Sequence, residues 1–277
     1  MHRLTSPAAP ILRPHLSRKF WLGLLGCCTT VVAAPFASAQ MGSPAPKSET
    51  VLTIEKALAS PLRSDEERAR DARERKPVQT LEFLGLEPNM RVLELLPGAG
   101  WYTKILGEVL RDNGKLYVSF GASRLAPRLK EWGMDHVEFV DDKSVLGRAP
   151  GLPLFQTDSI NLPVSDLDMV LTFRNAHNMT PETRQLLNRA VFAALKPGGI
   201  YGVVDHTRRH NEPTTTANWR RSDPVLIIKE ALDAGFEFEA FSNLHYRPDD
   251  ELRYDTQAPS LAGHSDRFAL KFRKPAR

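Results

Sequence analysis

The sequence predicts an α/β fold built on a doubly wound, mostly parallel seven-stranded sheet with helices on both faces. From residue 91 onward, short apolar runs alternate with segments of helical spacing, as parallel strands joined by crossover helices require. The run at 92–96 surrounds one carboxylate, Glu94, and ends in Pro-Gly-Ala-Gly, a turn that joins a buried strand to a helix. A second stop signal, Lys-Pro-Gly-Gly at 196–199, separates a helix from another apolar run.

Helices are expected before the sheet. Ser64, followed three residues later by Glu67, has the form of a capping box that starts a charged helix, and Pro77 suits the first turn of the next one. The expected ranges are 51–59, 64–76 and 78–84. We therefore expect an N-terminal helical extension at 51–90, followed by the sheet domain at 91–277.

Strands and helices alternate through the sheet domain. The strands are expected at 92–96, 115–120, 136–140, 168–173, 200–205, 236–241 and 267–272. The helices between them are expected at 101–110, 124–132, 181–195 and 225–234. The segment 247–265 has no such pattern, and loops of that length often carry function.

Residues 1–39 have the features of a secretory signal peptide. Basic residues precede the apolar run 20–34, and the small residues at 37–39 form a cleavage site. Residues 40–50 then form a flexible linker, so we expect an exported, periplasmic or secreted protein with no membrane span in its mature chain. Two alternatives stay open: an uncleaved membrane anchor, and a lipoprotein signal in which Cys27 carries a lipid anchor.

Charge and cysteine content argue against several classes of function. The leader holds four of the 37 basic residues and none of the 33 acidic ones, so the mature chain has equal numbers of each. Without a general excess of positive charge, no nucleic-acid partner is expected. Both cysteines, Cys27 and Cys28, lie in the leader, which leaves the mature chain without a disulfide or a thiol nucleophile. The Gly-x-Ser-x-Gly elbow of α/β hydrolases does not occur.

The turn after the first strand is the strongest sign of a ligand site. Gly98 and Gly100 let the backbone approach a ligand where a Cβ would collide, and the following helix points free N–H groups at it. The spacing differs from the Gly-x-Gly-x-x-Gly of NAD enzymes, because Thr103 stands where the third glycine belongs. A tight turn without a ligand is the alternative interpretation.

Four motifs carry a family likeness: Arg-Lys-Pro at 75–77, the turn and helix start at 97–103, and the segments 195–206 and 266–274. Through them the chain resembles the class I S-adenosylmethionine (SAM)-dependent methyltransferases, most closely an exported bacterial group of predicted methyltransferases. The likeness extends from about residue 63 to residue 274. It implies a Rossmann-like fold, SAM as cofactor and a small molecule as the methyl acceptor.

The resemblance also implies the residues of a cofactor site. The first motif would hold the amino-acid end of SAM with Glu94, Leu96, Pro97, Gly98, Ala99, Gly100 and Tyr102. Phe120 would pack on the adenine, with a place in the core as its alternative. Asp158 matches the acidic position that meets the adenine amino group, with a turn or cap role as its alternative.

Two positions depart from the family pattern. Leu96 replaces a glycine, and we expect Pro97 to keep it extended, a geometry that leucine adopts without strain. The strand at 115–120 ends without the acidic residue that binds both ribose hydroxyls, and Ser119 or Ser123 would replace only part of it. Each hydrogen bond to a charged group contributes about 1.5–3 kcal/mol, so this loss weakens cofactor binding.

Candidate chemistry lies beyond the fourth strand, because ligands bind outside the carboxyl ends of parallel strands. His177 is a candidate proton acceptor, since imidazole titrates near working pH, and Arg174 would orient the substrate. His206 has the same placement at the end of the fifth strand, and a histidine satisfied by backbone is the alternative for both. His206 and His210 have metal-ligand spacing only on a helix, whereas here a loop begins, so no metal is expected.

Two functions stay open, and no residue pattern names the substrate or the oligomeric state. In the first, the protein is a SAM-dependent methyltransferase whose charged helix faces an anionic substrate with Arg70, Arg73, Arg75 and Lys76. A solvated helix face is the alternative for that run. In the second, an exported methyltransferase-like protein has lost SAM binding and serves as a small-molecule binding or accessory protein, because SAM is scarce outside the cytoplasm.

Overall fold

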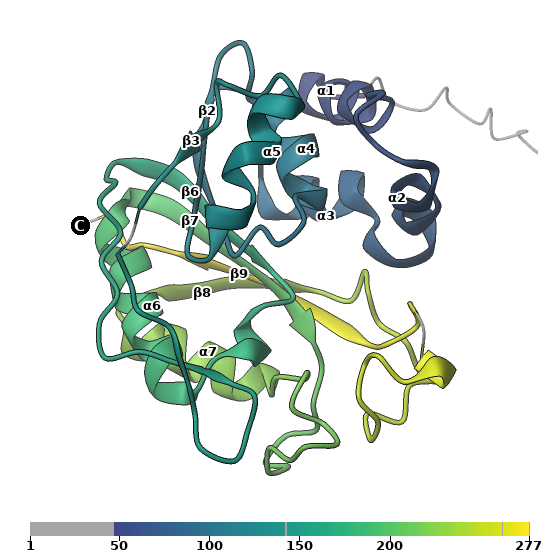
Figure 1. The fold of residues 1–277 in the computed structure, drawn as a ribbon, viewed down its shortest axis with the longest axis vertical. Helices are drawn as coiled ribbons and strands as arrows, with labels where there is room; N and C mark the ends of the chain where they lie inside the picture. Colours follow the sequence, from purple (N-terminus) through teal and green to yellow (C-terminus); the bar gives the residue numbers. More distant parts are fainter. Residues whose placement is uncertain (1–46, 142, 262, 277) are drawn as a thin grey trace, which may run out of the picture. The chain divides into compact units, whose positions relative to one another are not determined.

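A seven-stranded sheet organises the residues that the computed structural model describes, 47–141, 143–261 and 263–276 (Figure 1). Its order is β3-β2-β1-β6-β7-β9-β8. The strands are β1 Arg91–Leu95, β2 Lys115–Ser119, β3 Glu138–Phe139, β6 Leu167–Phe173, β7 Leu195–His206, β8 Glu237–Ser242 and β9 Arg267–Arg273. The first five strands in this order are parallel and β9 is antiparallel to both neighbours, which confirms the predicted fold class. The expected signal peptide at 1–39 and residues 40–46 of the expected linker lie outside the described residues.

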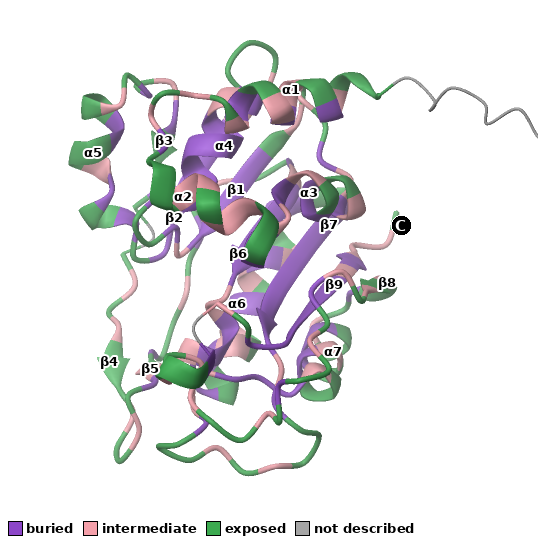
Figure 2. Cartoon of the chain, turned by 90° about the vertical axis from the view of Figure 1, so that its right-hand side faces the viewer, coloured by how far each residue is buried: buried purple, intermediate pink, exposed green. Residues whose placement is uncertain are grey.

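Helices cover both faces of the sheet (Figure 1). One face carries α1 Glu49–Leu58, α3 Pro77–Leu84, α4 Trp101–Val109 and α5 Ala126–Glu131, and the other carries α6 Pro181–Ala194 and α7 Pro224–Asp233. Successive side chains of β1 enter opposite layers: Val92 packs in the first core, and Leu93 and Leu95 pack in the second. All three are fully buried, and burial of each such side chain contributes about 1.5–3 kcal/mol. Figure 2 shows the same division, with buried strands between helices that expose their outer sides.

The N-terminal helices follow the sequence signals with one correction. Ser64 caps α2 (Asp65–Arg70): its Oγ accepts from the Glu67 N–H at 3.2 Å, and Glu67 accepts from the Ser64 N–H at 2.9 Å. The expected solvated helix to Lys76 is wrong in its last turn, because a π-helix covers Asp71–Arg75 and buries Glu74 and Arg75. The Lys76 N–H donates to the Asp71 carbonyl five residues back, which widens the turn before α3 begins at Pro77.

The structure also corrects the predicted start of β7. The sequence predicts a helix to 195 and a strand from 200, whereas β7 begins at Leu195, which pairs with Leu167 of β6 across an irregularity. The segment stays in the sheet because Gly198 donates to the Lys274 carbonyl and Lys274 donates to the Gly199 carbonyl, both at 2.9 Å. An unpredicted antiparallel ribbon, β4 Gly147–Arg148 with β5 Phe155–Gln156, lies in the connection to β6.

Gly202 of β7 is expected to be required for close packing of α3 on the sheet. A Cβ at this position would lie 2.7 Å from Leu171 Cδ2 and 2.9 Å from Leu84 Cδ2, both in the core. We expect Gly202→Ala to lower the free energy of unfolding by about 1–3 kcal/mol, because overpacking displaces buried side chains. Gly147→Ala is the control, since its nearest contact would be an ordinary 3.5 Å. Equal urea midpoints for the two variants would contradict the prediction.

Candidate functional site

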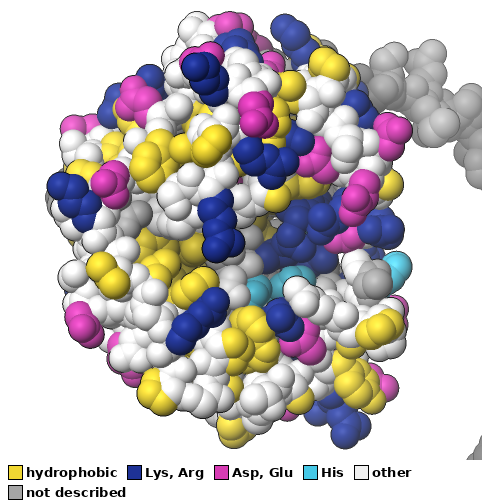
Figure 3. All heavy atoms as spheres, in the orientation of Figure 1, with side chains coloured by type: hydrophobic (Ala, Val, Ile, Leu, Met, Phe, Trp, Pro, Cys, Tyr) yellow, Lys and Arg dark blue, Asp and Glu magenta, His cyan; other side chains and the backbone are white. Residues whose placement is uncertain are grey.

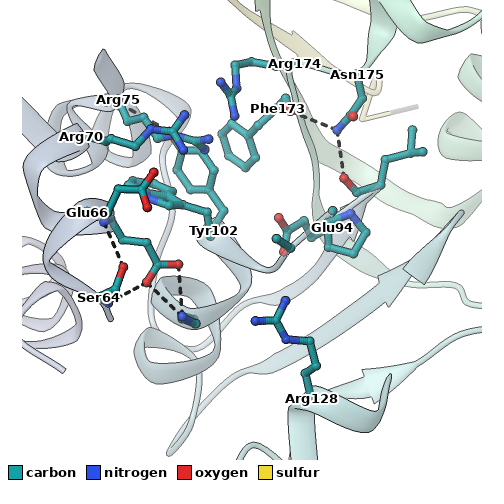
Figure 4. Close-up of a pocket in the computed structure, with 17 residues that line it drawn as sticks. Ser64, Glu66, Arg70, Arg75, Glu94, Tyr102, Arg128, Phe173, Arg174 and Asn175 are labelled. Carbon is teal, nitrogen blue, oxygen red and sulfur yellow. Dashed lines mark hydrogen bonds and ion pairs between the residues drawn. The ribbon is translucent and has the colours of Figure 1, made fainter. Parts of the chain in front are cut away.

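A cavity of about 490 Å³ lies where β1 and β6 end, with α2 along one side (Figure 4). The turn after β1, the start of α4 and the residues that follow β6 supply most of its wall. Its lining residues are Ser64, Glu66, Glu67, Arg70, Arg75, Glu94, Leu96, Pro97, Gly98, Ala99, Trp101, Tyr102, Lys104, Arg128, Phe173, Arg174 and Asn175. The cavity therefore occupies the edge at which ligands bind in open parallel sheets.

Leu96 adopts a left-handed conformation, which corrects the expectation of extended backbone. Its φ is 51°, a region in which a side chain other than glycine is strained by about 1–2 kcal/mol. Hydrogen bonds from both neighbouring strands hold it there: its N–H donates to the Ser119 carbonyl at 3.1 Å, and its carbonyl accepts from Asn175 Nδ2 at 2.9 Å. These bonds determine the backbone at Leu96 more strongly than the preference that Pro97 imposes.

The two glycines of the turn differ in what surrounds them. Gly98 has a φ of 58° and nothing lies within 4 Å of the position a Cβ would take. Gly100 has a φ of 83°, and a Cβ there would lie 2.7 Å from Trp132 and 2.9 Å from Leu125, so it is a packing position outside the cavity lining. Gly98 thus leaves space open at the cavity, and Gly100 lets α4 pack against the region of α5.

Glu94 supplies a carboxyl group at the inner end of the cavity (Figure 4). It is buried at 3 % exposure, and Thr103 Oγ1 donates to its Oε2 at 2.6 Å. Burial raises the pKa of Glu94 to about 7, although the Thr103 bond and Arg75 act in the opposite direction. The group therefore changes charge near neutral pH, and it can bind a cationic amine best when it is ionised.

Aromatic side chains form the wall between the turn and the end of β6. Tyr102 and Phe173 stack with ring centroids 3.6 Å apart at 12°, and Trp101 meets Tyr102 edge-on at 4.6 Å. Burial also raises the pKa of Tyr102, so the phenol stays neutral at working pH. The wall gives the cavity an apolar surface beside its charged groups.

The predicted histidines lie beside the cavity lining rather than in it. His177 lines a smaller cavity of about 60 Å³, together with Trp219, Arg208 and Ser222 among others. Burial and then the charge of Arg267 hold the pKa of His206 well below its usual value, so its ring is neutral. Its Nδ1 lies 2.9 Å from Ser265 Oγ, and its ring centroid lies 5.7 Å from that of His177.

Asp205 joins the two histidines. Its fully buried carboxylate accepts from the His177 N–H at 2.7 Å, the His206 N–H at 2.8 Å and Ser222 Oγ at 3.1 Å. It also lies 2.6 Å from His177 Nδ1. A carboxylate only accepts, so Nδ1 of His177 carries a proton and Nε2 is left as the proton acceptor.

The remaining predicted residues lie apart from the cavity lining. Phe120 is fully buried in the core beneath α6, with a φ of 56°, and Asp158 is exposed. Sequence reasoning did not single out Glu66, Glu67, Lys104 or Arg128, which line the cavity from α2, α4 and α5. The capping box at Ser64 predicts the start of the helix that carries Glu66 and Glu67, but no local signal predicts the pairing of Glu67 with Lys104 at 2.9 Å.

The described residues contain neither a cluster of metal ligands nor a helix suited to span a membrane. In residues 47–141, 143–261 and 263–276, no group of three or more His, Cys, Asp or Glu side chains is placed to hold a metal ion. His210 instead pairs with Asp223 at 2.9 Å. No helix in this part of the chain is long and apolar enough to cross a membrane.

Comparisons with known proteins find one protein that is similar over part of its sequence and several solved structures with the same fold. The chain matches no protein-family model. It is 31% identical over 148 residues to an uncharacterized methyltransferase of Synechocystis sp.. That stretch is 53% of this chain and 58% of the relative, so the similarity spans little more than half of either protein.

Two solved structures have the same architecture. A SAM-dependent methyltransferase from Aquifex aeolicus has a TM-score of 0.50 and 16% identity, over 80% of this chain and 97% of that one. The [4+2]-cyclase SpnF has a TM-score of 0.50 and 19% identity, over 76% of this chain and 82% of that one. At these identities the likeness shows the fold, and the cyclase shows that the fold alone does not fix a reaction.

Asp205 is expected to contribute strongly to stability. Asp205→Asn keeps the shape but exchanges one accepting oxygen for a donor, which leaves buried N–H groups without an acceptor. We expect the free energy of unfolding to fall by about 1–3 kcal/mol for each group left unsatisfied. Asp158→Asn is the matched control on an exposed aspartate and should lie within about 0.5 kcal/mol of the parent. Chemical denaturation measures both, and a neutral Asp205→Asn would refute the network.

Proposed function

We propose that the chain is a member of the class I methyltransferase superfamily that binds SAM and transfers its methyl group to a small molecule. The observation that carries the proposal is the turn at 96–100, which lines a 490 Å³ cavity and leaves open space at Gly98. Two comparisons support the proposal. The relative that matches part of the chain is named a methyltransferase, and one solved structure with the same fold is a SAM-dependent methyltransferase. The same turn is where the family likeness in the sequence is most specific.

We assign the amino-acid end of SAM to Glu94 and the backbone of the turn. An ionised Glu94 is suited to an ammonium group, and the first turn of α4 offers unsatisfied N–H groups to a carboxylate. The sulfur would then lie toward Tyr102 and Phe173, beyond which Arg174 and Asn175 line the cavity. With the cofactor in this position, the methyl acceptor would bind beside the end of β6.

Methyl transfer requires mainly that the acceptor atom and the methyl group be aligned. When bound, SAM supplies a methyl group on a positively charged sulfur, and an acceptor lone pair must be held in line with it and shielded from water. The stacked rings of Tyr102 and Phe173 exclude water, and Arg174 and Asn175 position the acceptor. His177, oriented by Asp205, is our proposed proton acceptor only for a methyl acceptor that reaches from the main cavity to the 60 Å³ cavity that His177 lines.

A second candidate function is a binding or accessory role without SAM. It is favoured by the end of β2, where Ser119 Oγ donates to the Val140 carbonyl at 2.9 Å and buried Phe120 follows, so neither residue offers a carboxylate for the ribose. The proposed export through residues 1–39, which lie outside the described ranges, favours the same role. Native mass spectrometry of protein isolated from its own compartment separates the two, because a bound molecule other than SAM or its product supports the second.

Gly98→Val tests the cofactor site. We expect the side chain to fill the open space at the turn and to weaken binding of S-adenosylhomocysteine by at least about 100-fold, as isothermal titration calorimetry measures it. Gly133→Val is the matched control, because Gly133 has a φ of 62° and equally open surroundings, and lies outside the cavity lining. If Gly98→Val bound like the control, the cofactor would have to bind elsewhere.

The raised pKa of Glu94 gives a pH dependence of known sign. Because burial raises this pKa to about 7, the group is mostly protonated at pH 6 and mostly ionised at pH 8. Binding of the S-adenosylhomocysteine ammonium group should therefore tighten by about 10-fold from pH 6 to pH 8. Glu94→Gln should remove that dependence, and 5′-methylthioadenosine, which has no amino group, should not show it. A flat profile for the parent protein would remove Glu94 from the amine site.

A further inference from the structure

We propose that the methyl acceptor carries an anionic group, a carboxylate or a phosphate, and that Arg75 and Arg174 hold it in the cavity. The inference rests on the proposed function and specifies its substrate class. On the face shown in Figure 3, Arg and Lys side chains gather in a hollow beside histidines. Figure 4 shows Arg70, Arg75 and Arg174 at the end of the cavity away from Arg128.

Arg75 is a buried cation without an acidic partner. It is 6 % exposed, and its guanidinium carbon lies 4.2 Å from the ring centroid of Trp101. Its Nε is buried without a hydrogen-bond partner, and it forms no ion pair within the described ranges. Burial and then the charge of Arg174 lower the pKa of Arg75 to about 8, so the surroundings of Arg75 disfavour its positive charge.

Arg174, half-buried on the other wall, is a second cation without an acidic partner among the described residues. It follows β6 with a φ of 61°, and its N–H donates to the Val204 carbonyl at 2.6 Å, which fixes the backbone in this strained region. Its buried Nε also has no hydrogen-bond partner, and its guanidinium forms no ion pair with the residues described. Burial and then Arg70 lower the pKa of Arg174.

The neighbouring acids are already committed. Glu74 accepts from Arg70 at 3.1 Å and Arg73 at 2.5 Å, and it lies 3.5 Å from Arg267. Burial raises the pKa of Glu74, but the bonds from Arg70 and Arg73 prevail and lower it to about 2. Glu67 pairs with Lys104. Glu66 and Glu94 also line the cavity, and the charge of Arg75 acts on Glu94, but neither carboxylate forms an ion pair with Arg75 or Arg174 in the described residues.

An anionic ligand would supply what the protein lacks. Buried charges are normally paired, because removing an ion from water without a partner costs several kcal/mol. A guanidinium offers parallel N–H donors that match the two oxygens of a carboxylate or phosphate. Arg75 and Arg174 both line the 490 Å³ cavity, and with the Tyr102 and Phe173 rings they also enclose a second space of only about 10 Å³.

The experiment titrates anions into the full mature protein saturated with S-adenosylhomocysteine. Inorganic phosphate and benzoate distinguish the two anion types, and benzamide is the neutral analogue of benzoate. We expect at least one anion to bind and benzamide not to bind. Arg174→Gln should weaken anion binding by about 10-fold or more while leaving S-adenosylhomocysteine affinity unchanged. Arg253→Gln, on an exposed arginine, is the matched control and should change neither affinity.

Arg174→Lys keeps the charge without the forked donors, so it should bind the anion with intermediate affinity and guards against misfolding of the glutamine variant. Absence of anion binding to the loaded protein would overturn the inference. So would an equal loss of S-adenosylhomocysteine affinity in Arg174→Gln, since the arginine would then hold the cofactor's own carboxylate. Failure of S-adenosylhomocysteine to bind the parent protein would instead overturn the proposed function. Titration of phosphate into the unloaded protein would in that case still test whether Arg75 and Arg174 bind an anion.

Discussion

The left-handed backbone of Leu96 is the constraint on which the geometry of the site depends. Ser119 of β2 and Asn175 after β6 each bond to this one residue, so the ends of β2, β1 and β6 are tied together at it. The chain then reverses into α4 with Gly98 open to the cavity and Gly100 packed against Trp132. Local strain of about 1–2 kcal/mol is tolerated because core packing on both faces of β1 is many times larger.

The charged side chains around this cavity fall into two groups, those with hydrogen-bond partners and those without. Asp205 and Glu74 are surrounded by donors, so each carboxylate is stabilised as an ion inside the protein. Arg75 is buried and Arg174 is half-buried, and both lack such partners among the described residues. The hydrogen-bonded carboxylates make the fold rigid. The unpaired arginines are the groups with which a ligand can form the most favourable new interactions.

The sheet could be predicted from the sequence because its signals are local. The continuous apolar run of β1, the capping box at Ser64 and the proline at the start of α3 each depend on a few neighbouring residues. Much of the candidate site depends on distant contacts instead. The conformation of Leu96 is set by Asn175, 79 residues away, and Arg267 reaches the Glu74 carbonyl across 193 residues. The burial of Arg75 could not be read from a charged run, because charge runs usually face solvent.

The π-turn at Asp71–Arg75 adds one residue to a helical turn that would otherwise close after four. Since each residue advances a helix by about 100°, the insertion decides which side chains of this arginine-rich stretch point inward. Deletion of one residue there is therefore expected to rotate Arg75, the one buried cation of this turn, away from its place on the Trp101 ring. One short insertion or deletion at this point would thus alter the charge at one end of the cavity, while the sheet and the turn at Leu96 stay the same.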